Sequence, residues 1–484
     1  MGWNGEETTK TKSGMRASSK VLLGMIACIM LIIVLIIILL MNMQGTTFKM
    51  YLNDSQISKE KANTLFANID GVTYFDIEKL SKLVGYEYHK GEYKASSIDE
   101  NKCYVEGITE TTSFYLNENK IYKLLVNEQT EQYKEYTVEN KIKSQNDIMY
   151  VPADAASIAF NILILEEENG IKIYTLDYLI NIYDSAAIKW GYTTIKEETF
   201  ENQKAILYGC LIVKKEGGLY KIIDTNNTKE IVLDRYTEIK FSENTQEFFV
   251  KDTFNKVGVI NLDGTTKIEP AYDSILVLDK ELDLYVIEQE KKYGVVAGNG
   301  KSVIYPEYDS IGLNNSNIVE NKYLILDELI PVYKDKKWGV YNKNGQLIFD
   351  VAYDEIGYTL NSIEINGVKE VVQPVIAIKR ANAIVLKQSN KYGLFDVTGR
   401  ELVRLAVDGI YAANGVKDEE ERYFMLYNGE ELNVIKRLIE AGLIEEKVEE
   451  NPSEELENTI PNIVANNLIN ELNGTLENAV NNEV

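Results

Sequence analysis

The stretch KWGVYNKNG (Lys337–Gly345) decides the fold, because its pattern recurs along the chain. Each copy has a lysine, an apolar or aromatic residue, a glycine, two apolar residues and a second glycine six positions after the first. The other copies are KVGVINLDG (Lys256–Gly264), KYGVVAGNG (Lys292–Gly300) and KYGLFDVTG (Lys391–Gly399). A degenerate copy, Leu219–Asn227, has asparagine at the second glycine position, and asparagine also tolerates a positive φ.

A second motif follows each copy at a constant distance. It reads AYDSI from Ala271, EYDSI from Glu307, AYDEI from Ala352 and AVDGI from Ala406, and its second residue lies eight positions after the second glycine. The first glycines are 36, 45 and 54 residues apart, so only the connecting segments vary in length. Constant units joined by variable connectors are typical of stacked repeats, and they predict an all-β repeat domain over residues 188–435.

Each unit has the pattern of a β-hairpin. An apolar pair such as Val259–Ile260 leads into an Asn/Asp-x-x-Gly turn, and apolar residues such as Ile268 continue the second strand. The first glycine, inside a strand, favours a bulge or a close backbone approach. A lone hairpin cannot bury its apolar face, so we expect the units to pack on one another. They could form a propeller-like ring or an open β-superhelix, and closure is preferred because a ring removes exposed edge strands.

These motifs resemble the WG repeat family over about residues 215–415. The resemblance implies a repeat scaffold and assigns no reaction or ligand. Valine or tyrosine replaces Trp338 in the other copies, so Trp338 is expected to pack within its unit, and Trp190–Gly191 is expected to open a further, decayed unit. The predicted signature residues, all structural, are Gly258, Gly264, Tyr272, Asp273, Gly294, Gly300, Tyr308, Asp309, Trp338, Gly339, Gly345, Tyr353, Asp354, Gly393, Gly399 and Asp408.

The repeated aspartates allow two interpretations. Asp273, Asp309, Asp354 and Asp408 could form a row of carboxylates that binds a metal ion or a glycan. Alternatively, each side chain accepts a hydrogen bond from a nearby backbone N–H in the turn after the tyrosine, as aspartate commonly does. Catalytic carboxylates need not recur at one structural position, so the structural interpretation is preferred.

The N-terminal part predicts a membrane anchor. Residues 21–41 contain no charge, and as a helix of about 30 Å they match the hydrocarbon thickness of a bilayer. Lysines and an arginine precede this run, so the positive-inside rule predicts a cytoplasmic stub (1–20), a single transmembrane helix (21–43) and an extracytoplasmic C-terminal bulk in the cell membrane.

Residues 48–182 predict a small α+β domain. Two segments, beginning near Gly71 and Asn146, each combine a short strand, an amphipathic helix and a further strand, with Asp76 and Asp154 as expected helix N-caps. Tyr150-Val151-Pro152 in the second segment resembles the stalk-like N-terminal domain of copper amine oxidases. The fold class is therefore mainly β, with a transmembrane helix, an α+β domain and an all-β repeat domain.

Composition argues against several kinds of site. A net charge of −24 argues against nucleic-acid binding. His89 is the only histidine, so a copper site or a multi-histidine zinc site cannot be assembled, and we predict no metal, no cofactor and no catalytic residues. A Cys103–Cys210 disulfide is left open. Residues 436–484 predict a short helix, with Val434, Leu438 and Ile439 at helical spacing, and an acidic, asparagine-rich tail.

The combined features predict a non-enzymatic, membrane-anchored protein of bacterial type, whose repeats bind an envelope polymer or a protein partner. The alternative is an extracytoplasmic hydrolase that cleaves glycan with paired carboxylates. A sensor is a third possibility, and it would need a cytoplasmic partner because the stub of residues 1–20 is too short for a catalytic domain.

Overall fold

The computed structural model describes residues 48–94, 99, 101–126, 131–226, 229–313 and 322–446. The chain divides into two compact units, Met1–Ala271 and Tyr272–Val484, and both are mainly β. The predicted transmembrane segment (21–43) and the tail beyond residue 446 lie outside the described residues. Within the described residues, no helix has the length and apolar character needed to cross a membrane.

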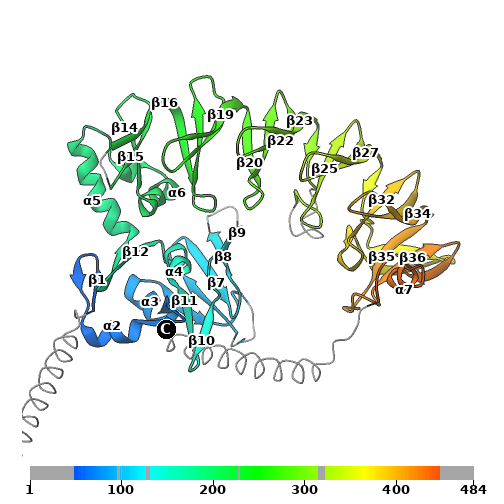
Figure 1. The fold of residues 1–484 in the computed structure, drawn as a ribbon, viewed down its shortest axis with the longest axis horizontal. Helices are drawn as coiled ribbons and strands as arrows, with labels where there is room; N and C mark the ends of the chain where they lie inside the picture. Colours follow the sequence, from blue (N-terminus) through cyan, green and yellow to red (C-terminus); the bar gives the residue numbers. More distant parts are fainter. Residues whose placement is uncertain are drawn as a thin grey trace, which may run out of the picture. The chain divides into compact units, whose positions relative to one another are not determined.

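The first unit begins with an α+β domain (Figure 1). Its strands are β1 (Lys49–Leu52), β2 (Ser55–Gln56), β3 (Phe66–Ile69), β4 (Val72–Asp76), β5 (Glu87–Lys90), β6 (Lys102–Glu106), β7 (Glu110–Tyr115), β8 (Lys120–Val126), β9 (Glu131–Thr137), β10 (Lys143–Gln145), β11 (Ile148–Pro152), β12 (Ile162–Glu167) and β13 (Gly170–Thr175). Its helices are α2 (Lys59–Leu65), α3 (Ile77–Val84) and α4 (Ala153–Phe160). The sheets have the strand orders β12-β13-β1-β2, β10-β11-β4-β3 and β5-β6-β7-β8-β9.

Both predicted strand–helix segments of this domain are present. β4 leads into α3, β11 leads into α4, and the two strands pair antiparallel with each other. Asp76 caps α3 as expected, because its Oδ1 accepts a hydrogen bond from Lys79 N at 3.0 Å. The prediction that Asp154 caps the second helix is wrong. That helix begins two residues earlier than predicted, at Ala153 with Pro152 as its N-cap, and Asp154 Oδ2 accepts a hydrogen bond from Glu139 N at 2.8 Å.

Helices join this domain to a six-stranded antiparallel sheet. They are α5 (Leu176–Lys189), η1 (Ile195–Glu197), α6 (Phe200–Gln203) and η2 (Lys204–Tyr208). The sheet contains, in order, β14 (Cys210–Lys214), β15 (Tyr220–Asp224), β16 (Lys229–Ser242), β17 (Glu247–Asp252), β18 (Val257–Asn261) and β19 (Thr266–Tyr272). Trp190–Gly191 does not open a repeat, which corrects the prediction: Trp190 is the C-cap of α5, and Gly191 has a φ of 80°.

The second unit contains three sheets that repeat one plan. Their strand orders are β20-β21-β22-β23, β24-β25-β26-β27 and β28-β32-β33-β34. The predicted hairpin forms the third and fourth strands of each sheet, and the variable connector supplies the second. The strands are β20 (Ser274–Asp279), β21 (Leu284–Gln289), β22 (Lys292–Ala297), β23 (Ser302–Tyr308), β24 (Ser310–Ile311), β25 (Leu329–Lys334), β26 (Lys337–Asn342), β27 (Leu347–Tyr353), β28 (Glu355–Ile356), β32 (Ala383–Gln388), β33 (Lys391–Asp396) and β34 (Glu401–Val407).

Neighbouring sheets of the second unit share apolar cores. Val332 of β25 is buried in one core with Val295 of β22 and Ile304 of β23. Val340 of β26 lies in the next core with Leu386 of β32. The expectation that the units pack on one another is confirmed within this unit, while closure into a ring stays a prediction.

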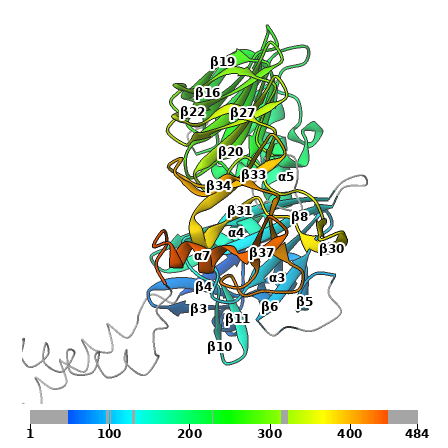
Figure 2. The same cartoon turned by 90° about the vertical axis from the view of Figure 1, so that its right-hand side faces the viewer.

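The last sheet of the second unit departs from the plan. Its order is β29-β30-β35-β36-β37, and a helix follows its last strand. The helix α7 lies against β36 and β37 (Figure 2) and buries Val434, Ile435 and Leu438, which agrees with the helix predicted from their spacing. The additional elements are β29 (Ser362–Ile365), β30 (Val368–Gln373), β31 (Ala377–Ile378), η3 (Lys379–Ala381), β35 (Gly409–Ala413), β36 (Tyr423–Tyr427), β37 (Glu430–Asn433) and α7 (Val434–Glu440).

Candidate functional site

The first glycine of each signature lies where two strands approach closely. A Cβ atom on Gly294 would lie 2.5 Å from the backbone oxygen of Ile304. The register also shifts at this point, since Tyr293 faces Tyr308 but Val295 faces Ile304. The equivalent glycines, also crowded by the neighbouring strand, are Gly258, Gly339 and Gly393. The geometry agrees with the bulge and the close backbone approach expected from the sequence.

The second glycine closes the hairpin turn. Gly264, Gly300, Gly345 and Gly399 have φ values of 83°, 76°, 80° and 93°, which L side chains rarely adopt. Gly345 N donates to Asn342 O at 3.0 Å. A Cβ atom on Gly345 would also collide with the backbone oxygen of Val303 in the preceding sheet, so this turn contributes to packing between sheets. Asn227, the predicted substitute for glycine, lies outside the described residues.

Each signature aspartate of the second unit contacts the sheet that follows it, as Asp309 shows. Its backbone N–H donates to Tyr333 O at 2.8 Å, and its Oδ2 accepts from Asp335 N at 3.1 Å in the β25–β26 turn. Its Oδ1 accepts from Lys292 Nζ at 2.6 Å, the lysine that opens the same signature 17 residues earlier. Within one signature, the lysine therefore binds one oxygen of the aspartate carboxylate, and the other oxygen binds the turn of the following sheet.

The other signature aspartates repeat parts of this arrangement. Asp273 Oδ2 accepts from Glu290 N at 2.8 Å, and Asp354 Oδ2 accepts from Ser389 N at 2.8 Å. Lys337 and Lys391 pair with Asp354 and Asp408, each across 17 residues. The prediction that each aspartate accepts from a nearby N–H in the turn after the tyrosine is therefore wrong. The N–H groups lie in the next sheet, 17, 26 and 35 residues after Asp273, Asp309 and Asp354.

These contacts also stabilise the charged form of the aspartates. The hydrogen bond from Lys292 holds the pKa of Asp309 below its ordinary value, and Lys337 does the same for Asp354. No group of three or more histidine, cysteine or acidic side chains in the described part of the chain is placed to hold a metal ion. The carboxylates of Asp273, Asp309 and Asp354 bind backbone N–H groups that connect successive sheets.

Aromatic signature residues pack between sheets. The ring of Trp338 is half-buried, lies 4.8 Å from that of Tyr333, and borders the core shared with the following sheet. Tyr392, in the equivalent position, is buried. Tyr308 and Tyr341 are joined by a hydrogen bond of 2.7 Å between their hydroxyls. Tyr272 and Tyr353 are half-buried.

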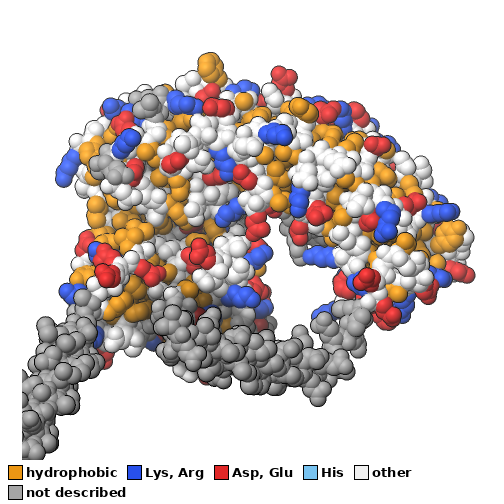
Figure 3. Space-filling view, in the orientation of Figure 1, with side chains coloured by type: hydrophobic (Ala, Val, Ile, Leu, Met, Phe, Trp, Pro, Cys, Tyr) orange, Lys and Arg blue, Asp and Glu red, His pale blue; other side chains and the backbone are white. Residues whose placement is uncertain are grey.

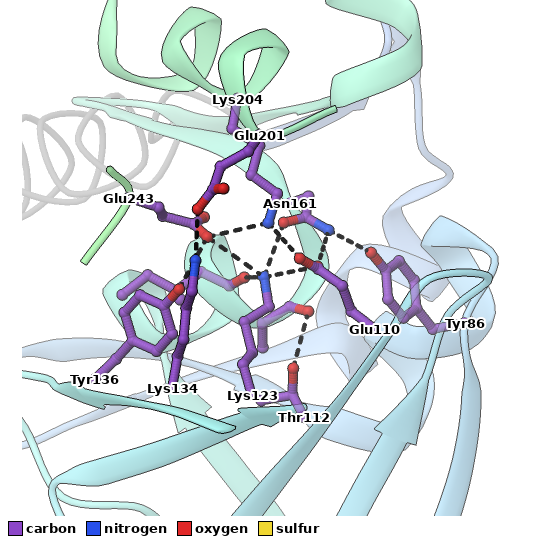
Figure 4. A network of polar contacts seen from close by, with 12 residues as sticks. Tyr86, Glu110, Thr112, Lys123, Lys134, Tyr136, Asn161, Glu201, Lys204 and Glu243 are labelled. Atoms are coloured by element: carbon purple, nitrogen blue, oxygen red, sulfur yellow. Dashed lines mark hydrogen bonds and ion pairs between the residues drawn. The ribbon is translucent and has the colours of Figure 1, made fainter. Parts of the chain in front are cut away.

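A buried cluster of charged side chains in the first unit has no counterpart among the predicted sites. It consists of Glu110 (β7), Lys123 (β8), Lys204 (η2) and Glu243 (between β16 and β17), whose side chains are at most 4% exposed. We call these four residues the charge cluster, and Figure 4 shows that they point toward one another. Lys123 Nζ lies 2.8 Å from Glu110 Oε2 and 3.7 Å from Glu243 Oε2. Lys204 Nζ pairs with both glutamates, at 3.1 Å from Glu243 Oε2.

Two neutral side chains, Asn161 and Tyr136, add hydrogen bonds to the charge cluster. Asn161 accepts from Lys123 Nζ at 2.9 Å through Oδ1 and donates to Glu110 Oε2 at 2.7 Å through Nδ2 (Figure 4). The hydroxyl of Tyr136 donates to Glu243 Oε2 at 3.2 Å. Buried charges are tolerated when they are paired and hydrogen-bonded in this way.

The ion pairs favour the charged forms of Glu110 and Lys204. Burial raises the pKa of Glu110, but Lys123 and Lys204 outweigh it and hold that pKa at about 2. Burial lowers the pKa of Lys204, but the two glutamates outweigh it and raise that pKa to about 12. Burial holds the pKa of Lys123 below its ordinary value, although Glu243 and Glu110 oppose the shift.

One signal in the sequence indicates a single member of the charge cluster, Lys123. In the strand KIYKLLV, Lys123 shares a face with the buried Ile121 by the period-two rule of a strand, so a lysine occupies a core position. Lys204 and Glu243 lie far along the chain, and no spacing links them to Lys123.

The two cysteines and the histidine among the described residues have structural surroundings. Cys103 and Cys210 are free and buried, so the disulfide left open by the sequence is not formed. Burial raises the pKa of the Cys210 thiol to about 12. His89 is a partly exposed residue of β5 that stacks on Tyr104 at 4.6 Å, as expected for an ordinary strand position.

Comparison with known proteins supports one of the two resemblances. Residues 258–293 and 338–361 match the family model described as WG containing repeat. The resemblance of residues 48–182 to the N-terminal domain of copper amine oxidases is not supported. No curated protein matches the chain.

Several solved structures share low similarity with the chain. BamB from Moraxella catarrhalis is 12% identical with a TM-score of 0.18, covering 46% of this chain and 72% of that chain. The WD40 β-propeller domain of Doa1 is 8% identical with a TM-score of 0.17, covering 70% and 93%. A eukaryotic initiation factor is 9% identical with a TM-score of 0.24, covering 68% and 91%. Because these TM-scores are low, they carry no argument, and the similarity that stands is to WG containing repeats at two stretches of the chain.

Proposed function

We propose that this protein is a non-enzymatic binding scaffold, anchored in the membrane by residues 21–43, whose repeat sheets bind an envelope polymer or a protein partner. One observation carries the proposal: the signature residues build the repeats, while the exposed positions between them differ from repeat to repeat. A repeated framework with a variable surface is the usual design of repeat proteins that bind extended partners.

The fourth strands illustrate this division. The residue that follows the buried Ile268, Ile304, Phe349 or Val403 is exposed in every repeat. These four exposed residues are Glu269, Tyr305, Asp350 and Arg404, so an acid, an aromatic, a second acid and a base occupy equivalent positions. Tyr305 is 75% exposed, and exposed aromatic and arginine side chains are frequent anchors of binding surfaces. Acidic and basic side chains are also interspersed over the face shown in Figure 3.

Placement outside the cytoplasm forms part of the proposal. The uncharged run at 21–41 and the positive residues before it support an N-terminus in the cytoplasm and a C-terminal bulk outside. The envelope is then the compartment in which the repeats would meet their partner.

The alternative function is a glycan hydrolase. Retention of envelope material distinguishes a binding scaffold from a hydrolase. The full-length protein in detergent micelles would be incubated with purified envelope polymer and with solubilised envelope proteins. The scaffold predicts retention without product release, weakened by the double variant Tyr305→Ala/Arg404→Ala. The control Ile108→Ala alters a fully exposed residue of the α+β domain and should leave retention unchanged. Release of soluble sugar that disappears on substitution of one pair of carboxylates would overturn the proposal.

A further inference from the structure

The geometry points to the charge cluster as a lock that fixes the α+β domain onto the six-stranded sheet, so that both sides loosen together when one of its charges is removed. Glu110 and Lys123 belong to the α+β domain, whereas Lys204 and Glu243 belong to η2 and the β16–β17 turn. Both sides lie in one compact unit, Met1–Ala271.

The pairing crosses the boundary between the two sides. Lys123 contacts Glu110 on its own side and Glu243 on the other, and Lys204 contacts Glu243 on its own side and Glu110 on the other. Separation of the two sides would leave each lysine with one glutamate in place of two. Each charge would then lack part of the compensation that makes its burial tolerable.

Apolar packing and a second ion pair accompany the cluster at the same boundary. Leu163 and Tyr174, from β12 and β13, pack against a core that contains Ile206 of η2. Lys134 of β9 pairs with Glu201 of α6, and these side chains are 25% and 46% exposed. The charge cluster is therefore the dry part of this interface, and the Lys134–Glu201 pair is accessible to water.

Glu243 is the least satisfied member of the lock. Its Oε2 accepts hydrogen bonds from Lys204 and Tyr136, but its buried Oε1 has no hydrogen-bond partner among the described residues. Both lysines contact its carboxylate, so removal of this charge would leave Lys123 and Lys204 with Glu110 as their only acidic partner within the cluster.

Two substitutions, one on each side, test the lock in the full-length chain. Lys123→Met removes a charge from the α+β domain, and Glu243→Gln is the nearly isosteric change on the other side. Each should raise amide hydrogen exchange in β7 and β8 and also in β14 and η2. An increase of roughly a hundredfold or more is expected, because breaking a buried ion pair leaves an uncompensated charge. Exchange in β20–β23 of the second unit should stay unchanged and provides the internal reference.

The control is Lys134→Met, which removes the hydrated ion pair of the same interface and should change exchange less than a few fold. The decisive result is that a substitution on either side increases exchange on both sides. Faster exchange confined to the side that carries the substitution would overturn the lock, as would an effect of Lys123→Met no larger than that of Lys134→Met. If Lys123→Met fails to fold, Glu243→Gln decides the question alone by whether β7 and β8 respond.

Discussion

The signature aspartate connects one repeat to the next through a single carboxylate. In Asp309 one carboxylate oxygen accepts from Lys292 of its own sheet, and the other accepts from a turn of the following sheet. A contact of this kind requires both the residue pair at constant separation and a turn at a constant place in the next unit. This requirement explains why lysine and aspartate recur together in four signatures, 17 residues apart.

We predict that Asp309→Asn destabilises the second unit in a pH-dependent way. The folded pKa of Asp309 is lowered, so its contribution is present above the ordinary carboxyl pKa of 3.8 and is lost as the pH falls through the lower folded value. Urea unfolding at pH 7 should show a lower midpoint for the variant, and the difference should shrink at pH 2.5. Asp350→Asn, an exposed aspartate outside the signature, is the control, and a difference that does not depend on pH would contradict this role.

Glycine substitutions separate a clash with backbone from a clash with a side chain. Gly294→Ala would place Cβ 2.5 Å from Ile304 O, whereas in Gly339→Ala the nearest atom is a methyl carbon of Val351 at 2.7 Å. A side-chain methyl can move more easily than a backbone oxygen. We expect Gly294→Ala to lower the free energy of unfolding by about 1–3 kcal/mol or more and Gly339→Ala by less, measured by urea denaturation. Equal losses would show that the strand spacing adjusts at both positions.

The residues that sequence reasoning identified are those with local causes. Asp76 caps the helix that begins immediately after it, and the turn glycines adopt a positive φ within their own hairpin. The partner of the aspartate carboxylate was misplaced because the turn that it contacts lies in the next sheet. The charge cluster could not be predicted as a set, because residues 110, 123, 204 and 243 meet only after folding.

At the scale of elements, a repeat is a four-stranded sheet with a constant half and a variable half. The hairpin of strands three and four carries the signature, and the connector supplies the second strand, as β25 does in the Trp338 sheet. The hairpin could be predicted because its turn and alternation are local. The connector strands could not be predicted, because the connectors differ in length. Each connector supplies the second strand of its sheet by pairing with the hairpin.

Substitutions of Trp338 distinguish a packing role of the signature aromatic from a role in binding the partner. Tyrosine occupies this slot in two other copies, so Trp338→Tyr should change the free energy of unfolding by less than about 1 kcal/mol. Trp338→Ala should cost about 2 kcal/mol, since the half-buried ring packs on Tyr333. Both values come from urea denaturation. A Trp338→Tyr variant of unchanged stability that no longer retains the partner would show that the ring is a binding residue.

The helix α7 should be essential for the last sheet. Leu438 is 2% exposed, so Leu438→Ala should lower the free energy of unfolding by about 2–5 kcal/mol. Hydrogen exchange should locate the loss in β36 and β37, against which α7 packs. Glu440→Ala, whose side chain is 64% exposed on the same helix, is the control and should change stability by less than about 0.5 kcal/mol. Unchanged exchange in β36 and β37 after Leu438→Ala would contradict this role.

At the scale of the molecule, the proposed topology joins three tasks in one chain. The N-terminal segment would anchor the protein, the α+β domain would hold the first repeat sheet through the charge cluster, and the repeats would present the variable surface. The anchor is a prediction from the sequence pattern, and the variable surface is proposed from the exposed residues of the repeats. The connection between the domain and the sheet rests on contacts between residues far apart in the chain.

Site-specific photocrosslinking on intact cells tests the binding scaffold most directly. A photoreactive amino acid would replace Tyr305 on the repeats, 75% exposed, or Ile108 on the α+β domain, fully exposed. The account predicts that an envelope polymer or protein is captured at position 305, from outside the membrane, and far less at position 108. Capture at position 108 alone, or at neither position, would contradict the assignment of the binding surface to the repeats.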